Sequence, residues 1–234
     1  MSKCPQCEDE VREDAAFCPN CGYNLKQGEV SDAEAPGERK RSYTEHLTIA
    51  YNVANQNPTV FVPALLAGII SSGLNWLGQG SLGVMAILVS IAASIIAFML
   101  SFASLDMSRD AYNRQPLDLG ESMRYVSGRF LEFLVAAIVG GIMSITIILI
   151  PVVVLMFSIM VIDETGLTNS LSRAFSVLGA DLSDILLILL VNILGSFIIS
   201  YVPLVSGLLN SALNVIIGLA FIDLYYNYKR PAQG

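Results

Sequence analysis

The chain has 234 residues, of which 54% are hydrophobic and only 14% are charged, and its formal net charge is −7. A soluble domain usually carries about a quarter charged residues, so this composition indicates a chain that has lipid as part of its solvent. The acidic balance argues against a nucleic-acid-binding protein, because such a protein presents a basic surface to the phosphates. The composition therefore predicts an integral membrane protein that binds no nucleic acid.

The first element along the chain is a cluster of four cysteines, arranged as two Cys-Pro-x-Cys pairs. Two residues between paired cysteines let both thiolates face one tetrahedral ion, and two pairs complete a four-sulfur shell with no open position. Such a closed shell is structural, and its confinement to one short segment favours metal over a disulfide framework. A redox-active pair and unpaired thiols are the alternatives. We predict a zinc ribbon over residues 1–25 with a structural Zn²⁺ ion held by Cys4, Cys7, Cys18 and Cys21.

The segments CPQC and FCPNCG, and the distance between them, resemble the short zinc-ribbon family that opens many archaeal and bacterial membrane proteins. One departure is Glu8, where that family usually has glycine after its second cysteine. The ligand residues are unaffected by this departure. The resemblance implies a zinc site and leaves the task of the protein open.

Residues 26–42 mix charged residues, Gly, Pro and Ala with almost no large apolar side chain, which is typical of a flexible linker. The linker ends in a basic cluster just before the first apolar segment. This cluster is either a determinant of topology or a contact for anionic lipid headgroups. Its members are Arg39, Lys40 and Arg41.

Residues 43–57 predict a short helix lying in the membrane interface. The apolar residues that follow helical spacing there are Leu47, Ala50, Tyr51 and Ala54. His46, the only histidine of the chain, falls within this segment with no second metal ligand or nucleophile beside it. We therefore expect its side chain to be a polar contact at the level of the lipid headgroups.

Long apolar runs follow, and a membrane span needs about 20 such residues. Two runs satisfy this directly, whereas two longer runs contain Pro151 and Pro203, at which we expect tight hairpins. The sequence thus predicts an all-α integral membrane domain over residues 43–228 with about six transmembrane helices and interfacial amphipathic helices. The expected spans are residues 58–78, 82–105, 130–149, 151–163, 184–202 and 204–224.

With six spans, the predicted outer connections contain no Lys or Arg, and all 13 basic residues fall on the side of the N-terminus. The positive-inside rule makes that side cytoplasmic. We therefore expect a multi-pass protein of the cell membrane with both termini in the cytoplasm.

Three apolar hairpins end alike, in Asp106, Asp163 and Asp223. An amphipathic pattern follows the first two endings, over residues 119–130 and 167–178. The repeating unit is thus a hairpin followed by a surface helix, copied about three times. We expect the three aspartates to mark helix exits into water; a cytoplasmic acidic ring is the alternative reading.

This layout, together with the segments ETG (164–166) and SLSRAF (170–175), resembles a loose group of uncharacterised six-span membrane families. The group includes relatives of the membrane domain of bacterial glycerophosphodiester phosphodiesterases. The resemblance implies no chemistry for this domain, because catalysis in such enzymes belongs to a separate domain.

Four polar residues are placed within the apolar runs. Glu132 lies near the start of the third predicted span, where it marks a proton or ion path or reaches the interface beside Arg129. The other three are expected to form hydrogen bonds between helices. They are Asn192, Asn210 and Asn214.

The sequence contains no GxSxG, HExxH, Walker loop or paired histidines, so we expect no enzymatic activity. The function that this pattern favours is a non-catalytic membrane protein whose ribbon docks a cytoplasmic protein or another copy of the chain. The alternatives are a small transporter or channel, motivated by the repeat, and a lipid-binding or bilayer-shaping protein, motivated by the surface helices. Membrane lipids are expected partners in every case.

Overall fold

The structure is a computed structural model that describes residues 2–3, 10–11, 41–77, 83–202 and 205–229. The chain divides into two compact units, one formed by Met1–Arg39 with Ala232–Gly234 and the other by Lys40–Pro231. In the first unit, two short strands pair antiparallel, with Ser2 opposite Val11. These strands are β1 (Ser2–Lys3) and β2 (Glu10–Val11). The four cysteines lie outside the described residues.

The described secondary-structure elements of the second unit are all helices. Its elements are α1 (Tyr43–Gln56), η2 (Pro58–Phe61), α2 (Val62–Leu77), α3 (Val84–Tyr112), α4 (Leu119–Gly128), α5 (Phe130–Ser144), η3 (Ile147–Leu149), α6 (Ile150–Ile162), α7 (Leu167–Ala180), α8 (Leu182–Ser200) and α9 (Ser206–Lys229). Two hairpins, α2–α3 and α5–α6, are each followed by a short helix, and α8–α9 forms the third pair. This element order agrees with the repeat read from the sequence.

The helix predicted over residues 43–57 is confirmed as α1, which begins with a capping box formed by Ser42 and Glu45. The chain then bends by 101° into the next helix. The inward face of α1 differs from the prediction, because Tyr51 is 58% exposed and the buried residues are His46, Ala50 and Ala54. Their i, i+4, i+8 spacing defines one stripe, with the histidine at the position nearest the helix start.

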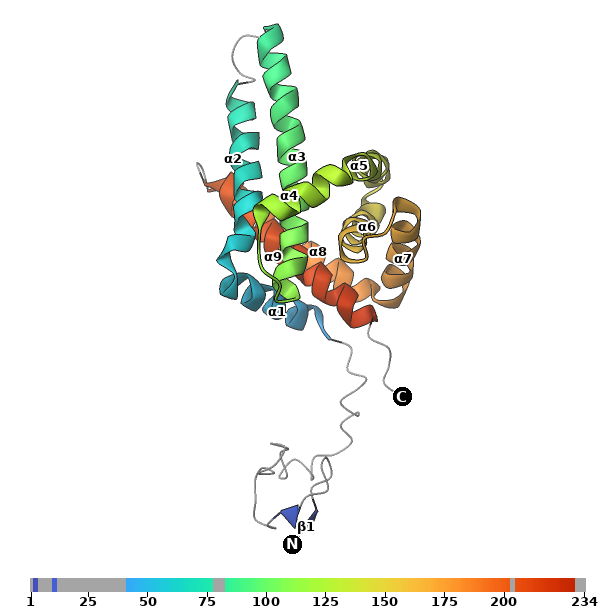
Figure 1. Ribbon diagram of the computed structural model, residues 1–234. Helices are drawn as coiled ribbons and strands as arrows, with labels where there is room; N and C mark the ends of the chain where they lie inside the picture. The colour runs from blue at the N-terminus through green and yellow to red at the C-terminus, as the bar shows by residue number, and fades with distance from the viewer. Residues whose placement is uncertain (1, 4–9, 12–40, 78–82, 203–204, 230–234) are drawn as a thin grey trace. The chain divides into compact units, whose positions relative to one another are not determined.

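The α2–α3 hairpin extends beyond the other helices at one end of the unit, and α1 lies across the opposite end (Figure 1). The core lies where the second half of α3 packs against α6 and α9. Nine of the 13 residues of α6 are buried. The rings of Phe102 and Phe133 stack with centroids 4.3 Å apart, and Phe157 contacts Phe102 edge-on.

The expectation of about six spans is not confirmed. Among the described residues, α3, α8 and α9 are long and apolar enough to cross a membrane, and the number rises to five if each of two bent helix pairs is one span. Helices α5 and α6 have 15 and 13 residues. At about 1.5 Å per residue each is shorter than the roughly 30 Å of a hydrocarbon core. Pro151 stands in the first turn of α6, where its missing N–H breaks no helical bond.

Candidate functional site

The charged side chains of the helical unit gather at the end where α3, α6 and α9 terminate, whereas residues 57–105 contain no charged residue. The three repeated aspartates lie at this end and are all buried, with side chains that are 3%, 6% and 0% exposed for Asp106, Asp163 and Asp223. The expectation that they mark exits into water is wrong. Each carboxylate is instead paired with cations or hydroxyls, most of them from other helices.

Asp223 on α9 joins three segments of the chain. Its Oδ1 accepts hydrogen bonds from Arg41 Nη1 at 2.6 Å and from the Tyr112 hydroxyl at 2.5 Å. Its Oδ2 lies 2.6 Å from His46 Nδ1, and both of these side chains are fully buried. Charge-assisted bonds of this kind are the strong ones, and here they fasten the start of α1 to α3 and α9. We call Asp223, Arg41, His46 and Tyr112 the Asp223 cluster.

The Asp223 cluster bears on two expectations from the sequence. His46 makes its polar contact with a buried carboxylate of the protein, because α1 turns its side chain inward. The guanidinium of Arg41 is held by the same carboxylate and is 25% exposed, so its described contact is with protein. Arg39 and Lys40, the other residues of the expected headgroup contact, lie outside the described residues.

Asp163 follows the last residue of α6 and connects that end to α7 and α9. It accepts hydrogen bonds from the Tyr225 hydroxyl at 2.5 Å and from Lys229 Nζ at 2.7 Å, and it pairs with Arg173 of α7. Burial acts to raise the pKa of Asp163, but the hydrogen bonds from Lys229 and Tyr225 and the charge of Arg173 outweigh burial and hold that pKa below its ordinary value.

The lowered pKa of Asp163 predicts a specific pH dependence. A carboxyl whose pKa is lower in the folded chain stabilises the fold above its unfolded pKa of about 4, and this contribution is lost as the pH falls through the folded pKa. Asp163→Asn should therefore melt below wild type at pH 7, and the difference should shrink below about pH 4. Thermal melting of the purified chain in detergent between pH 7 and pH 3 measures this. Glu164→Gln, at a 62% exposed neighbour, is the control; a difference that stays constant down to pH 3 contradicts the prediction.

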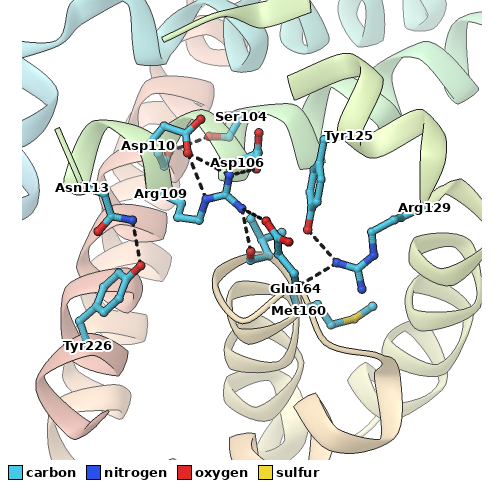
Figure 2. A network of polar contacts seen from close by, with 12 residues as sticks. Ser104, Asp106, Arg109, Asp110, Asn113, Tyr125, Arg129, Met160, Glu164 and Tyr226 are labelled. Carbon is cyan, nitrogen blue, oxygen red and sulfur yellow. Dashed lines mark hydrogen bonds and ion pairs between the residues drawn. The ribbon is translucent and has the colours of Figure 1, made fainter. Parts of the chain in front are cut away.

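Arg109 and Arg129 close the C-terminal end of α6, as Figure 2 shows. Arg109 lies 2.8 Å from the buried Asp106 and donates to the Val161 carbonyl at 3.0 Å. Arg129 donates to the Met160 carbonyl at 3.2 Å. The last carbonyls of a helix have no partner within the helix and lie at the negative end of its dipole. The two arginines, from α3 and from the start of α5, supply those missing partners.

Arg129 also holds the turn that follows α6. It donates to the Thr165 carbonyl at 2.9 Å and to the Tyr125 hydroxyl at 2.8 Å. Between these points Glu164 has a φ of 49°, in the left-handed region that favours glycine, while its carboxylate lies 3.3 Å from Arg109. The turn is therefore kept in an unfavourable backbone conformation by two cations.

The four polar residues singled out within the apolar runs do not come together. Glu132 is 53% exposed and lies 2.6 Å from Arg129, the neighbour that the sequence suggests for it. Asn192 and Asn210 have buried carboxamide oxygens that accept no hydrogen bond from the part of the chain that the structure describes, so the expected interhelical bonds to these oxygens are not formed there. Asn214 faces a cavity.

This cavity lies between α2, α3 and α9 and has a volume of about 480 Å³. We call it the serine cavity, because six of its lining residues are serines and no described lining residue is charged. The helices approach closely beside it: a Cβ added to Gly68 would lie 2.5 Å from Ser211 Oγ, so a larger residue there would displace this hydroxyl. The lining residues are Ala64, Ala67, Gly68, Ser71, Ser72, Ser101, Ser104, Leu105, Ser108, Gly207, Ser211, Asn214, Val215 and Gly218.

Two residues that bind the buried aspartates were not identified from the sequence. Tyr112 and Tyr225 carry hydroxyls that bind the aspartates, yet at a helix end they resemble ordinary interfacial tyrosines. The available signal was the recurrence of Asp after each apolar hairpin, together with single basic residues nearby. That signal identifies the acceptors without identifying their donors.

The N-terminal residues 3–25 match the family model of a zinc-ribbon domain. The four cysteines lie within this match, and the strands β1 and β2 bracket the segment that holds the first Cys-Pro-x-Cys pair. Four thiolates in two such pairs suit tetrahedral Zn²⁺, so Cys4, Cys7, Cys18 and Cys21 fit the metal that the family usually binds. Residues 3–25 are a zinc-ribbon domain.

A similar protein is an uncharacterized protein of Haemophilus influenzae (strain Rd), which is 32% identical over 47 residues. The match covers 20% of this chain and 62% of that relative, so this chain spans less than two thirds of the relative's length. No solved structure matches the chain. The zinc ribbon and the long apolar helices together describe a membrane protein with an N-terminal zinc-ribbon domain.

Proposed function

We propose that the chain is a non-catalytic, multi-pass protein of the cell membrane whose ribbon docks a protein partner in the cytoplasm. The observation that supports the proposal is that the ribbon segment and the helical domain form two separate compact units. The buried aspartates of the helical unit find their partners within that unit, from Arg41 onward. A four-cysteine shell has no open position for a substrate, so a structural ribbon of this kind is suited to present a surface to another protein.

The orientation in this proposal rests on where the basic side chains lie. Arg41, Arg109, Arg129, Arg173 and Lys229 all contact the aspartates, the α6 carbonyls or the Glu164 turn at one end of the helical unit. The opposite tip of the α2–α3 hairpin belongs to the uncharged run of residues 57–105. By the positive-inside rule, the basic end faces the cytoplasm, and the ribbon precedes α1, which begins at that end.

A zinc and crosslinking experiment on the full chain tests the docking role. The double variant Cys18→Ser/Cys21→Ser removes half of the ligand set, and Glu8→Gly is a matched control that changes the ribbon without touching a ligand. Wild type and Glu8→Gly should each bind about one zinc per chain by elemental analysis, as a four-cysteine shell requires. Both should also give the same crosslinked cytoplasmic protein or dimer in cells, and the double variant should lose the zinc and the crosslink at equal membrane level. An unchanged crosslink in the double variant refutes docking through the ribbon.

A further inference from the structure

The serine cavity has more hydrogen-bonding capacity than helix packing requires. Small residues at helix crossings normally let backbones approach until little space is left. Here a volume of about 480 Å³ stays open beside the close crossing at Gly68. Ligand pockets typically measure about 300–1,000 Å³, so the serine cavity has the size of a site for a small molecule.

The hydroxyls of the cavity fall into two sets. Those of Ser101, Ser108 and Ser211 donate to the carbonyls four residues earlier, at 2.9, 2.7 and 2.9 Å. A hydroxyl whose hydrogen is used in this way still offers oxygen lone pairs, so these three serines present acceptors to the cavity.

Ser104 belongs to the other set, together with the exposed Ser71 and Ser72. It is 7% exposed and lines the cavity, and its hydroxyl forms no hydrogen bond with any described residue. Its hydroxyl oxygen is open to the cavity, so it is free to donate a hydrogen bond to a ligand there as well as to accept one.

We propose that the serine cavity binds an uncharged polyhydroxyl group. Each hydroxyl of such a group both donates and accepts, which matches a lining that offers acceptors from three serines and an unused donor at Ser104. The described lining contains no cation or anion to bind a charged ligand, and Ala64, Ala67 and Val215 provide apolar wall for the carbon skeleton. The group can belong to a free polyol or to the sugar headgroup of a neutral glycolipid.

Two probes distinguish these sources on the full chain in detergent. The free polyol is erythritol, followed by saturation-transfer NMR, and the glycolipid is monogalactosyl diacylglycerol, followed by native mass spectrometry. The variants are Ser104→Ala, which removes the unused hydroxyl, and Ser104→Leu, which fills the space. Ser176→Ala, on an exposed serine of α7 that does not line the cavity, is the control.

We expect saturable binding of one probe to wild type and to Ser176→Ala. Ser104→Ala should weaken it by about three- to tenfold, the equivalent of one hydrogen bond, and Ser104→Leu should abolish it. Melting curves check that each variant is folded. If Ser104→Leu is not folded, the test rests on Ser104→Ala alone. The proposal is overturned if neither probe binds saturably, if Ser104→Ala binds as tightly as wild type, or if the cavity of wild type is filled by a co-purified lipid without a sugar headgroup.

Discussion

Replacing Asp223 by alanine should lower the free energy of unfolding of the helical unit by about 3–5 kcal/mol, the usual cost of removing one partner from a buried ion pair. The reason is the number of groups that lose their acceptor. Arg41, Tyr112 and His46 all direct donors at this carboxylate, and His46 is itself fully buried. Asp223→Asn should cost less, because the amide keeps the shape and one acceptor while losing the charge.

The measurement for Asp223 is the fraction of purified protein that remains monodisperse in detergent after heating, converted to an apparent melting temperature. Glu164→Gln serves as the surface control, since an exposed ion pair contributes about 1 kcal/mol or less. A double-mutant cycle adds a sharper test. Once Asp223 is alanine, His46→Ala should cost little more, because residues that share one network are not additive. Additive losses, or an Asp223→Ala variant as stable as Glu164→Gln, would contradict the cluster as described.

The features that could be predicted from the sequence are those encoded within one turn or one helix. The spacing of Cys4, Cys7, Cys18 and Cys21 predicts a metal shell because ligand geometry is local. The surface helices α1, α4 and α7 could be read from their apolar periodicity for the same reason. Even so, the periodicity of α1 placed Tyr51 inward, because a polar residue such as His46 does not count toward an apolar stripe.

The features that could not be predicted depend on residues far apart in the chain. The partners of Asp223 are 182, 177 and 111 positions away, at Arg41, His46 and Tyr112. Without them, an aspartate at the end of an apolar run is reasonably expected in water. The same holds for the serine cavity, whose walls come from α2, α3 and α9.

The count of six spans is not confirmed, for a different physical reason. An apolar run indicates that a segment is buried away from water. Either lipid or the protein interior can bury it. Helix α6 is apolar because other helices surround it, and nine of its 13 residues are buried in protein. Hydropathy alone therefore does not distinguish a membrane span from a short helix packed inside the bundle, such as α6.

Arg129→Ala should destabilise the helical unit by about 2–4 kcal/mol, because hydrogen bonds to charged groups each contribute about 1.5–3 kcal/mol and two carbonyls lose their donor together. The affected acceptors are the carbonyls of Met160 and Thr165, at the end of α6 and in the turn that follows. The guanidinium also lies over the ring of Phe133, 5.3 Å from its centroid, so packing is lost as well.

Arg129→Lys separates charge from geometry in this prediction. A lysine keeps the positive charge near Glu132 but lacks the planar fork that reaches two carbonyls and the Tyr125 hydroxyl at once. We therefore expect Arg129→Lys to recover less than half of the stability lost in Arg129→Ala. Arg124→Ala and Arg124→Lys, at an exposed position on α4, are the matched controls and should change little.

Hydrogen exchange of the segment 163–166 gives a local readout for the same variants. Glu164 is held at a positive φ between the contacts made by Arg109 and Arg129, and such a conformation costs on the order of 1–3 kcal/mol unless its surroundings impose it. When Arg129 is removed, the turn should relax and its amides should exchange faster, ahead of any change in α9. Uniform acceleration across the helical unit would instead mean that Arg129 stabilises the bundle without any special hold on this turn.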